Sequence, residues 1–151
     1  MRLARLIAAG FGTGYAPRAP GTVASAAALL VGAVLLAVSP LALALAALAA
    51  TIGGFIAVEL ADVTGDPGWV VIDEIAGQWI ALLALAWPTL PGLAIAFVLF
   101  RLFDIAKPGP VGWADRKHGT FGIMTDDLIA GVLAAAILAL LRLLWPGLLL
   151  L

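Results

Sequence analysis

Long runs of apolar residues alternate with short polar or proline-containing joints along the whole chain. Each of five such runs is close to the length that an α-helix needs to cross a bilayer. Membrane helices need no polar stripe, because both lipid and neighbouring helices are apolar, and these runs have none. The pattern predicts an all-α, compact, polytopic membrane bundle with about five transmembrane or membrane-embedded helices. We interpret residues 1–151 as one membrane-embedded domain, with the runs at residues 22–38, 41–60, 72–87, 91–103 and 127–145.

Local signals place the ends of several helices. Thr22 is expected to cap the first long helix, and Ser39 with the following proline is expected to end it. Thr125 is expected to cap the fifth helix, which puts Asp126 and Asp127 in its first turn. The first residues carry two arginines before a glycine-rich break, which is typical of a short amphipathic helix at the membrane surface and not of a cleaved signal.

Composition supports a membrane location and narrows the available chemistry. The 151 residues are 64% hydrophobic and 11% charged, with a net charge of −1 and no basic stripe for a nucleic-acid backbone. Zero cysteines and a single histidine exclude disulfides, thiolate metal sites and sites with two imidazoles. Any chemistry must therefore use carboxylates, basic residues, hydroxyls and backbone amides.

The charged residues gather on one side of the predicted bundle. Seven of the eight basic residues fall there, Arg142 being the exception, and the positive-inside rule makes this side cytoplasmic. Trp87 and Trp145 are expected to anchor the opposite interface. The acids fall on the same side as the basic residues, and they are Glu59, Asp62, Asp66, Asp73, Glu74, Asp104, Asp115, Asp126 and Asp127.

A glycine-rich loop precedes the first long helix. Its glycines at residues 10–14 and Gly21 let backbone N–H groups approach an anion, while Arg18 and the helix start at Thr22 add positive charge. An ordinary loop that caps a helix explains the same residues. The spacing does not match a dinucleotide-binding fingerprint.

Two helices are predicted to begin with adjacent acids, each with a glycine one turn further on. Acids in a first turn also complement the helix dipole, so the pattern alone is ambiguous. Carboxylates at membrane depth are costly, however, unless a cation meets them, and hard oxygen ligands suit Mg²⁺. We expect the two helix starts to face each other; they are Asp73-Glu74 with Gly77, and Asp126-Asp127 with Gly131.

A third cluster follows the fourth run. At helical spacing Arg101, Asp104 and Lys107 share one face, which brings one acid and two bases to the same place. A surface ion-pair ladder is the alternative, although it contributes only about a few tenths of a kcal/mol. Asp115 and His118, in the loop before the fifth helix, are further candidates, and a histidine there is more often a loop hydrogen-bonder than a catalyst.

Together, four motifs make the chain resemble the phosphatidylglycerophosphatase A family over nearly its whole length. Ala24 stands where the family usually has a glycine, and Thr120 replaces one glycine of the loop before the last motif. The motifs are Gly12-Thr13-Gly14 with Ala19-Pro20-Gly21-Thr22, Ile72-Asp73-Glu74 with Gly77, Phe100-Arg101 with Phe103-Asp104-Ile105 and Lys107-Pro108, and Gly122-Ile123-Met124 with Asp126-Asp127 and Ala130-Gly131.

The resemblance implies an Mg²⁺-dependent phosphatase of the bacterial inner membrane, with its active face cytoplasmic. Such enzymes remove the terminal phosphate of phosphatidylglycerophosphate, a phospholipid substrate in the bilayer, and leave phosphatidylglycerol. Catalysis then depends on positioning and on neutralising phosphoryl charge. We expect Asp104 to be the base or nucleophile, with Asp73 and Asp127 also catalytic. Attack by metal-bound water and an aspartyl-phosphate both stay open. The expected metal ligands are Asp73, Glu74, Asp126 and Asp127, and the expected phosphate-binding residues are Arg18, Gly21, Thr22, Arg101 and Lys107.

An ion-coupled small transporter or channel is the alternative from another class, because carboxylates in apolar surroundings also mark ion paths. The clustering of acids at one face and the lack of an inverted repeat argue against it. A lipid-binding subunit without activity is a third reading. The sequence does not indicate an oligomeric state.

Overall fold

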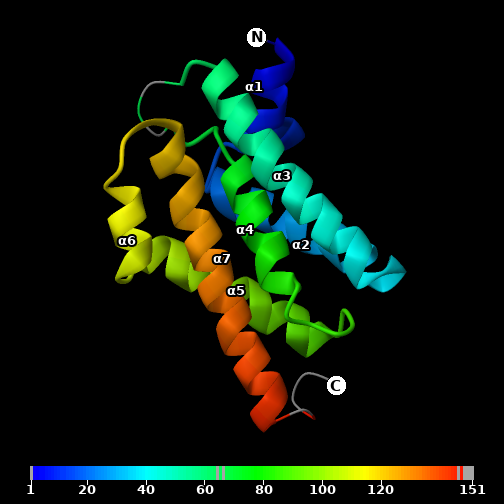
Figure 1. The fold of residues 1–151 in the computed structure, drawn as a ribbon. Helices are drawn as coiled ribbons and strands as arrows, with labels where there is room; N and C mark the ends of the chain where they lie inside the picture. Colours follow the sequence, from blue (N-terminus) through cyan, green and yellow to red (C-terminus); the bar gives the residue numbers. More distant parts are fainter. Residues whose placement is uncertain (1, 64, 66, 146, 148–151) are drawn as a thin grey trace.

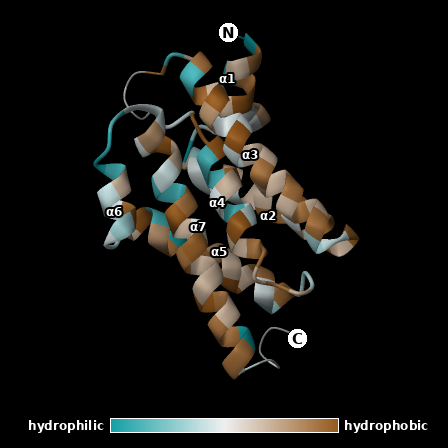
Figure 2. Ribbon diagram, in the orientation of Figure 1, coloured by the Kyte–Doolittle hydropathy of each residue, from teal (hydrophilic) through white to brown (hydrophobic). Residues whose placement is uncertain are grey.

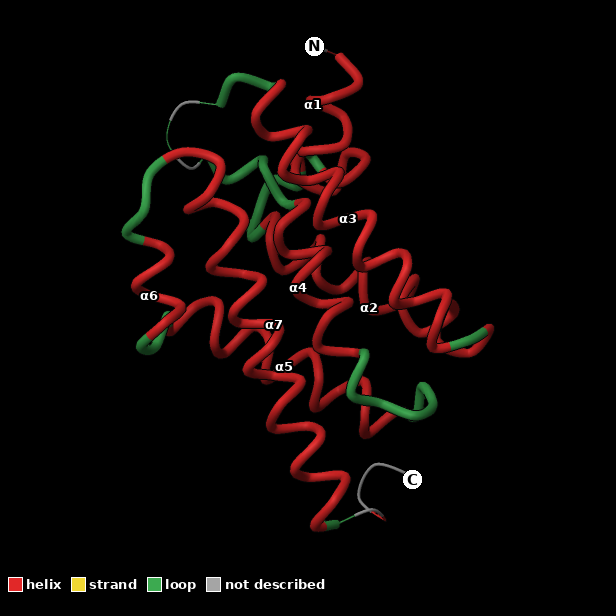
Figure 3. Tube along the Cα trace, viewed as in Figure 1, coloured by secondary structure: helices red, strands yellow, loops and turns green. Residues whose placement is uncertain are grey.

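The computed structural model describes residues 2–63, 65, 67–145 and 147 as a bundle of helices, with no strand in this part of the chain (Figures 1 and 3). The expected all-α fold is confirmed; Asp66 lies outside the described residues. The elements are α1 (Arg2–Ala8), the 3₁₀ helix η1 (Gly10–Tyr15), α2 (Pro20–Val38), α3 (Pro40–Leu60), α4 (Ile72–Leu82), α5 (Leu90–Ala106), α6 (Pro110–Asp115) and α7 (Gly119–Leu144).

Each of the five apolar runs forms a helix, but the helices differ in reach. Among the described residues, α2, α3 and α7 are long and apolar enough to cross a membrane, with 19, 21 and 26 residues. At ~1.5 Å per residue, the 11 residues of α4 reach only about 16 Å. The expected helix over residues 72–87 is therefore too long. Beyond Leu82 the N–H groups of Leu83 and Leu85 bond to carbonyls three residues back, and Pro88 follows.

Two predicted helix starts are wrong. Helix α2 begins at Pro20, whose fixed φ suits a first helical position, so Thr22 lies inside the first turn. Helix α7 begins at Gly119, so Thr125 lies inside the helix and the two acids after it lie beyond its first turn. Ser39 behaves as expected: it ends α2, and its hydroxyl caps α3 by accepting from the N–H of Ala42 at 2.9 Å.

Helix α4 occupies the centre of the bundle, between α2, α3, α5 and α7 (Figure 1). Eight of its eleven residues are buried. The indole N–H of Trp79 donates to the carbonyl of Ala28 at 2.8 Å and ties α4 to α2. On the other side α4 touches α7 backbone to backbone: a Cβ on Gly77 would lie 2.6 Å from the carbonyl oxygen of Asp127, and one on Gly131 would overlap Gly77.

Hydrophobic and hydrophilic residues separate along the bundle (Figure 2). Hydrophilic residues gather at α6 and toward the upper ends of α3, α4 and α7, whereas the α2–α3 pair and the lower half of α7 are mainly hydrophobic. Large apolar side chains such as Leu30, Val34 and Ile56 are exposed on the long helices. An aqueous solvent would make such exposure costly, so this surface is that of a membrane protein.

Candidate functional site

Three carboxylates meet where α4 and α7 touch. Asp73 and Glu74 come from the first turn of α4 and Asp127 comes from α7, and each offers an oxygen within 4.8 Å of the others. We call these three residues the carboxylate cluster. Asp73 and Asp127 are buried, and Oε2 of Glu74 is buried without a hydrogen-bond partner. No ion pair among the described residues involves any of the three.

The close contact between Gly77 and Gly131 explains this meeting. Since neither glycine has a side chain, the two helix backbones approach closely, and the acids one turn before each glycine face each other. The sequence prediction that the two acid pairs face each other is therefore confirmed for Asp73, Glu74 and Asp127.

Burial makes the negative charges of the α4 acids unfavourable. Burial raises the pKa of Asp73 well above its usual value, and the charges of Glu74 and Asp127 raise it further. Burial also raises the pKa of Glu74. A bound cation stabilises the charged form and displaces such protons. Three hard oxygen donors at this spacing are compatible with a metal ion.

Asp126 differs from its neighbour Asp127. Its Oδ2 accepts a hydrogen bond from Nζ of Lys107 at 2.7 Å, and the same ammonium pairs with Asp115 of α6. Burial lowers the pKa of Lys107, but the hydrogen bonds and charges of Asp115 and Asp126 outweigh it and raise the pKa above its usual value. Asp126 therefore lies outside the carboxylate cluster and has a cation of its own.

Lys107 also departs from the expected shared face with Arg101 and Asp104. It is the C-cap residue of α5 and adopts the left-handed conformation, with φ of 46°. This turn directs the chain away from the helix axis, so the spacing of three no longer aligns Lys107 with Asp104. The prediction of one common face is correct for Arg101 and Asp104, which form an ion pair, and wrong for Lys107.

Arg101 lies beside the carboxylate cluster, at the start of α2. Its Nη2 donates to the hydroxyl of Thr22 at 3.3 Å, and its Nη1 donates to the hydroxyl of Ser25 at 3.4 Å. Its Nε is buried without a partner. A Cβ on Gly21 would overlap the Glu74 carboxylate and lie 3.4 Å from Nη1 of Arg101. The structure thus brings Gly21, Thr22 and Arg101 together as expected.

Sequence reasoning missed the role of Ser25. It is fully buried, donates to the carbonyl of Gly21 at 2.8 Å and supports Arg101, which is 76 residues away in the chain. Its position one turn after Gly21, on the same helix face, was the available signal.

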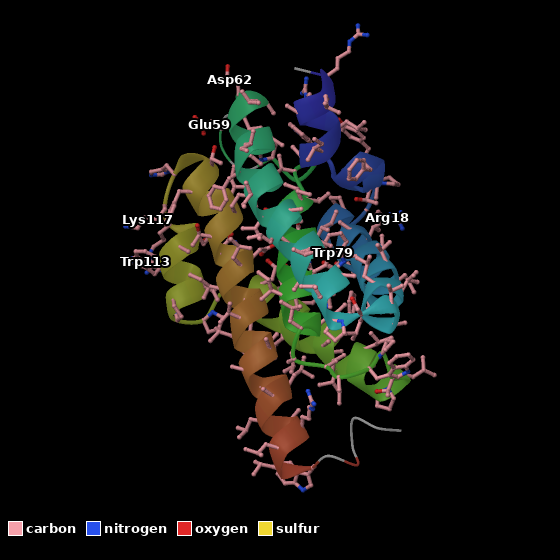
Figure 4. All side chains as sticks on the ribbon, turned by 45° about the vertical axis from the view of Figure 1, so that its right-hand side comes forward. Arg18, Glu59, Asp62, Trp79, Trp113 and Lys117 are labelled. Carbon is pink, nitrogen blue, oxygen red and sulfur yellow. The ribbon has the colours of Figure 1, made fainter. Side chains whose placement is uncertain are left out.

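Other residues of the sequence motifs differ in exposure and in partners. Arg18 is exposed, and Figure 4 places it at the opposite edge of the molecule from Lys117. His118 is exposed and precedes the first turn of α7. Asp115 faces Lys107 and not the carboxylate cluster. Gln78 is fully buried in α4, and neither of its side-chain polar atoms has a hydrogen-bond partner.

The chain matches the family described as phosphatidylglycerophosphatase A over residues 6–142. The chain belongs to the phosphatidylglycerophosphatase A family. A phosphatidylglycerophosphatase A of Escherichia coli is 40% identical over 148 residues, which cover 93% of this chain and 84% of that protein. A phosphatidylglycerophosphatase A of Haemophilus influenzae is 36% identical over an alignment that covers 87% of this chain and 84% of that protein.

A third relative has a different name. A protein of Bacteroides thetaiotaomicron called a putative phosphatidylinositol-3-phosphatase is 37% identical, over 91% of this chain and 92% of its own length. No solved structure shows a significant match. The phosphatidylglycerophosphatase A family match supports a phospholipid phosphatase and gives no support to the ion-coupled transporter.

Proposed function

We propose that the chain hydrolyses phosphatidylglycerophosphate to phosphatidylglycerol and inorganic phosphate, with help from Mg²⁺. The observation that carries this proposal is the buried carboxylate cluster beside Arg101, an anion-binding side chain. The proposal places one domain, residues 1–151, in the bacterial inner membrane, with its polar face toward the cytoplasm. The acyl chains of the substrate remain in the bilayer while the headgroup meets this face.

The carboxylate cluster is the proposed metal site. Asp73, Glu74 and Asp127 would hold the ion, because they supply hard oxygen ligands and have no ion pair of their own among the described residues. When bound, Mg²⁺ would neutralise charge on the phosphoryl oxygens. Asp126 then serves a supporting role, because Lys107 occupies its carboxylate.

The terminal phosphate is proposed to bind between Arg101 and the start of α2. Arginine presents several donors in a planar fork that suits phosphate, and Nε of Arg101 is buried and unpaired. The hydroxyl of Thr22 and the backbone beside Gly21 lie at the same place. We leave Arg18 and Lys107 out of this proposed set, because Arg18 is exposed and Lys107 pairs with Asp115 and Asp126.

Asp104 is the proposed general base. Its carboxylate pairs with Arg101, which lies beside Glu74 of the carboxylate cluster, so it lies near both the phosphate and the metal positions. From there it can accept a proton from the attacking water as the ester bond breaks. The ion pair with Arg101 fixes its orientation.

Phosphate release from defined lipids tests this function. Purified protein in mixed micelles should release inorganic phosphate from phosphatidylglycerophosphate when Mg²⁺ is present. The release should stop on chelation and return when Mg²⁺ is added back. Chelator-resistant release would contradict the metal site, whereas no release under any condition would contradict the proposed activity.

A further inference from the structure

A small polar pocket is lined in part by Asp126, the residue before Asp127 of the carboxylate cluster. Its volume is about 140 Å³, and Gly65 of the connection between α3 and α4 closes one side. The loop between α6 and α7 and the beginning of α7 form the rest, with Asp115, Lys117, His118, Gly119, Gly122 and Asp126. Neither the metal site nor the phosphate site proposed above uses this pocket.

Several contacts hold the walls of this pocket in place. A Cβ on Gly122 would overlap the carbonyl of Lys117, so the loop lies directly against the first turn of α7. The ammonium of Lys117 lies 4.9 Å from the ring centre of Trp113, and Figure 4 shows both at the same edge of the molecule. Thr120 donates to Glu59 at 2.6 Å and ties the start of α7 to the end of α3.

The pocket and the carboxylate cluster are neighbours along one helix. Asp126 lines the pocket and the next residue, Asp127, belongs to the cluster. Lys107 bridges the two acids of the pocket, Asp115 and Asp126. The pocket therefore lies next to the proposed metal site along α7, with Asp126 in its wall.

The lining indicates which chemical group fits. Asp115 and Asp126 accept hydrogen bonds, as an alcohol requires, while Lys117, His118 and the N-terminal end of α7 favour an anion. About 140 Å³ is roughly the volume of four or five water molecules. This space suits a three-carbon polyol and is far too small for an acyl chain.

We propose that this pocket binds the polyol and phosphodiester that connect the terminal phosphate to the diacylglycerol. We call it the headgroup pocket. It would distinguish phosphatidylglycerophosphate from a lipid such as phosphatidate, whose phosphate is attached directly to diacylglycerol. This inference rests on the proposed function, because it assumes that the terminal phosphate occupies the adjacent site.

Comparison of the two lipids in His118→Ala tests the headgroup pocket. The ratio of kcat/KM for phosphatidylglycerophosphate to kcat/KM for phosphatidate should fall about tenfold, because only the first lipid reaches the pocket. Lys117→Ala should lower the same ratio. Arg116→Ala is the matched control, since Arg116 is an exposed cation of the same loop that does not line the pocket, and it should leave the ratio unchanged.

The outcomes separate this inference from the proposed function. Equal loss on both lipids, or no loss on either, would overturn the headgroup pocket while the phosphatase activity stands. No phosphate release from either lipid by the wild-type chain would overturn both.

Inhibition by soluble anions gives a second readout that does not depend on turnover of phosphatidate. Glycerol phosphate should inhibit the wild-type chain more strongly than inorganic phosphate does, because its polyol fills the headgroup pocket. In His118→Ala this preference should disappear while inhibition by inorganic phosphate is kept. A preference that survives in both His118→Ala and Lys117→Ala would overturn the inference.

Discussion

Asp126 and Asp127 are adjacent in α7, have the same side chain and are both buried, yet their surroundings are opposite. Asp126 accepts a hydrogen bond from Lys107, which also pairs with Asp115. Asp127 instead lies with Asp73 and Glu74, and no ion pair among the described residues reaches these three. Neighbouring helix positions point about 100° apart, so one helix serves two different environments.

We interpret this difference as one between a structural acid, Asp126, and a proposed metal ligand, Asp127. A buried carboxylate with a resident cation is satisfied within the protein, and its removal leaves that cation unpaired. A buried carboxylate without one raises the free energy of the folded state until an outside cation arrives. The same residue type in one sequence motif can therefore have two functions.

The largest expected effect is that of Asp127→Asn. Loss of this ligand should lower kcat/KM more than about a hundredfold, which is about 2.7 kcal/mol of transition-state stabilisation. Asp126→Asn is the matched control one residue away and should lower kcat/KM less than about tenfold. Initial rates of phosphate release from both purified variants measure this, and equal losses would remove the distinction between the two acids.

Lys107→Gln should act on stability more than on turnover. It leaves Asp115 and Asp126 facing each other without their cation, which should lower the free energy of unfolding by about 2 kcal/mol. The cost is below that of a fully buried pair, because the Lys107 side chain is 30% exposed. Thermal unfolding in detergent and turnover per folded molecule measure the two effects. A large fall in turnover with unchanged stability would place Lys107 on the substrate instead.

Binding of Mg²⁺ should raise the stability of the wild-type chain. At a concentration about ten times Kd, a ligand that binds only the folded state adds about 1.4 kcal/mol to the free energy of unfolding. Asp127→Asn should lose this increase and Asp126→Asn should keep it. Thermal unfolding with Mg²⁺ and with chelator measures the increase, and its persistence in Asp127→Asn would show that the ion binds elsewhere.

The smallest expected effect concerns the start of α7. Thr120→Val removes the hydrogen bond to Glu59 and should lower the free energy of unfolding by about 0.5 kcal/mol, because the bond is exposed. Thr120→Ser keeps the hydroxyl and is the control. Chemical denaturation resolves the difference. Loss of activity in Thr120→Val alone would show that this bond also sets the positions of the two α7 acids.

The helical fold was predictable from the runs of apolar residues. Part of the site was predictable from the acid pair and following glycine that occur twice in the sequence. Runs of apolar residues identified the helices, and the repeated acid pair with its following glycine identified the contact of α4 with α7. Helix starts were less predictable. Threonine is a common N-cap residue, but Thr22 and Thr125 both lie inside their helices. Residues 119–124 continue the helix back to Gly119 although they include two glycines, so the local residue types do not indicate where α7 begins.

The partners of Lys107 and Arg101 could not be predicted from spacing. The left-handed turn at Lys107 directs its side chain to Asp115 and Asp126, which are 8 and 19 residues later in the chain. Helical periodicity predicts a contact with Asp104 instead. Arg101 reaches hydroxyls 76 and 79 residues earlier in the chain. Both arrangements depend on how the helices cross, which a single sequence does not encode in any short pattern.

The contact between Gly77 and Gly131 has a consequence for ion choice. Because backbone meets backbone there, the width of the gap between the ligand-bearing turns does not depend on side-chain rotamers. A cage of fixed width discriminates between ions by radius, and a narrow cage favours Mg²⁺ over the larger Ca²⁺. If α4 and α7 hold the proposed metal, the two glycines would act as a spacer, and a methyl group at either position would widen the gap toward larger ions.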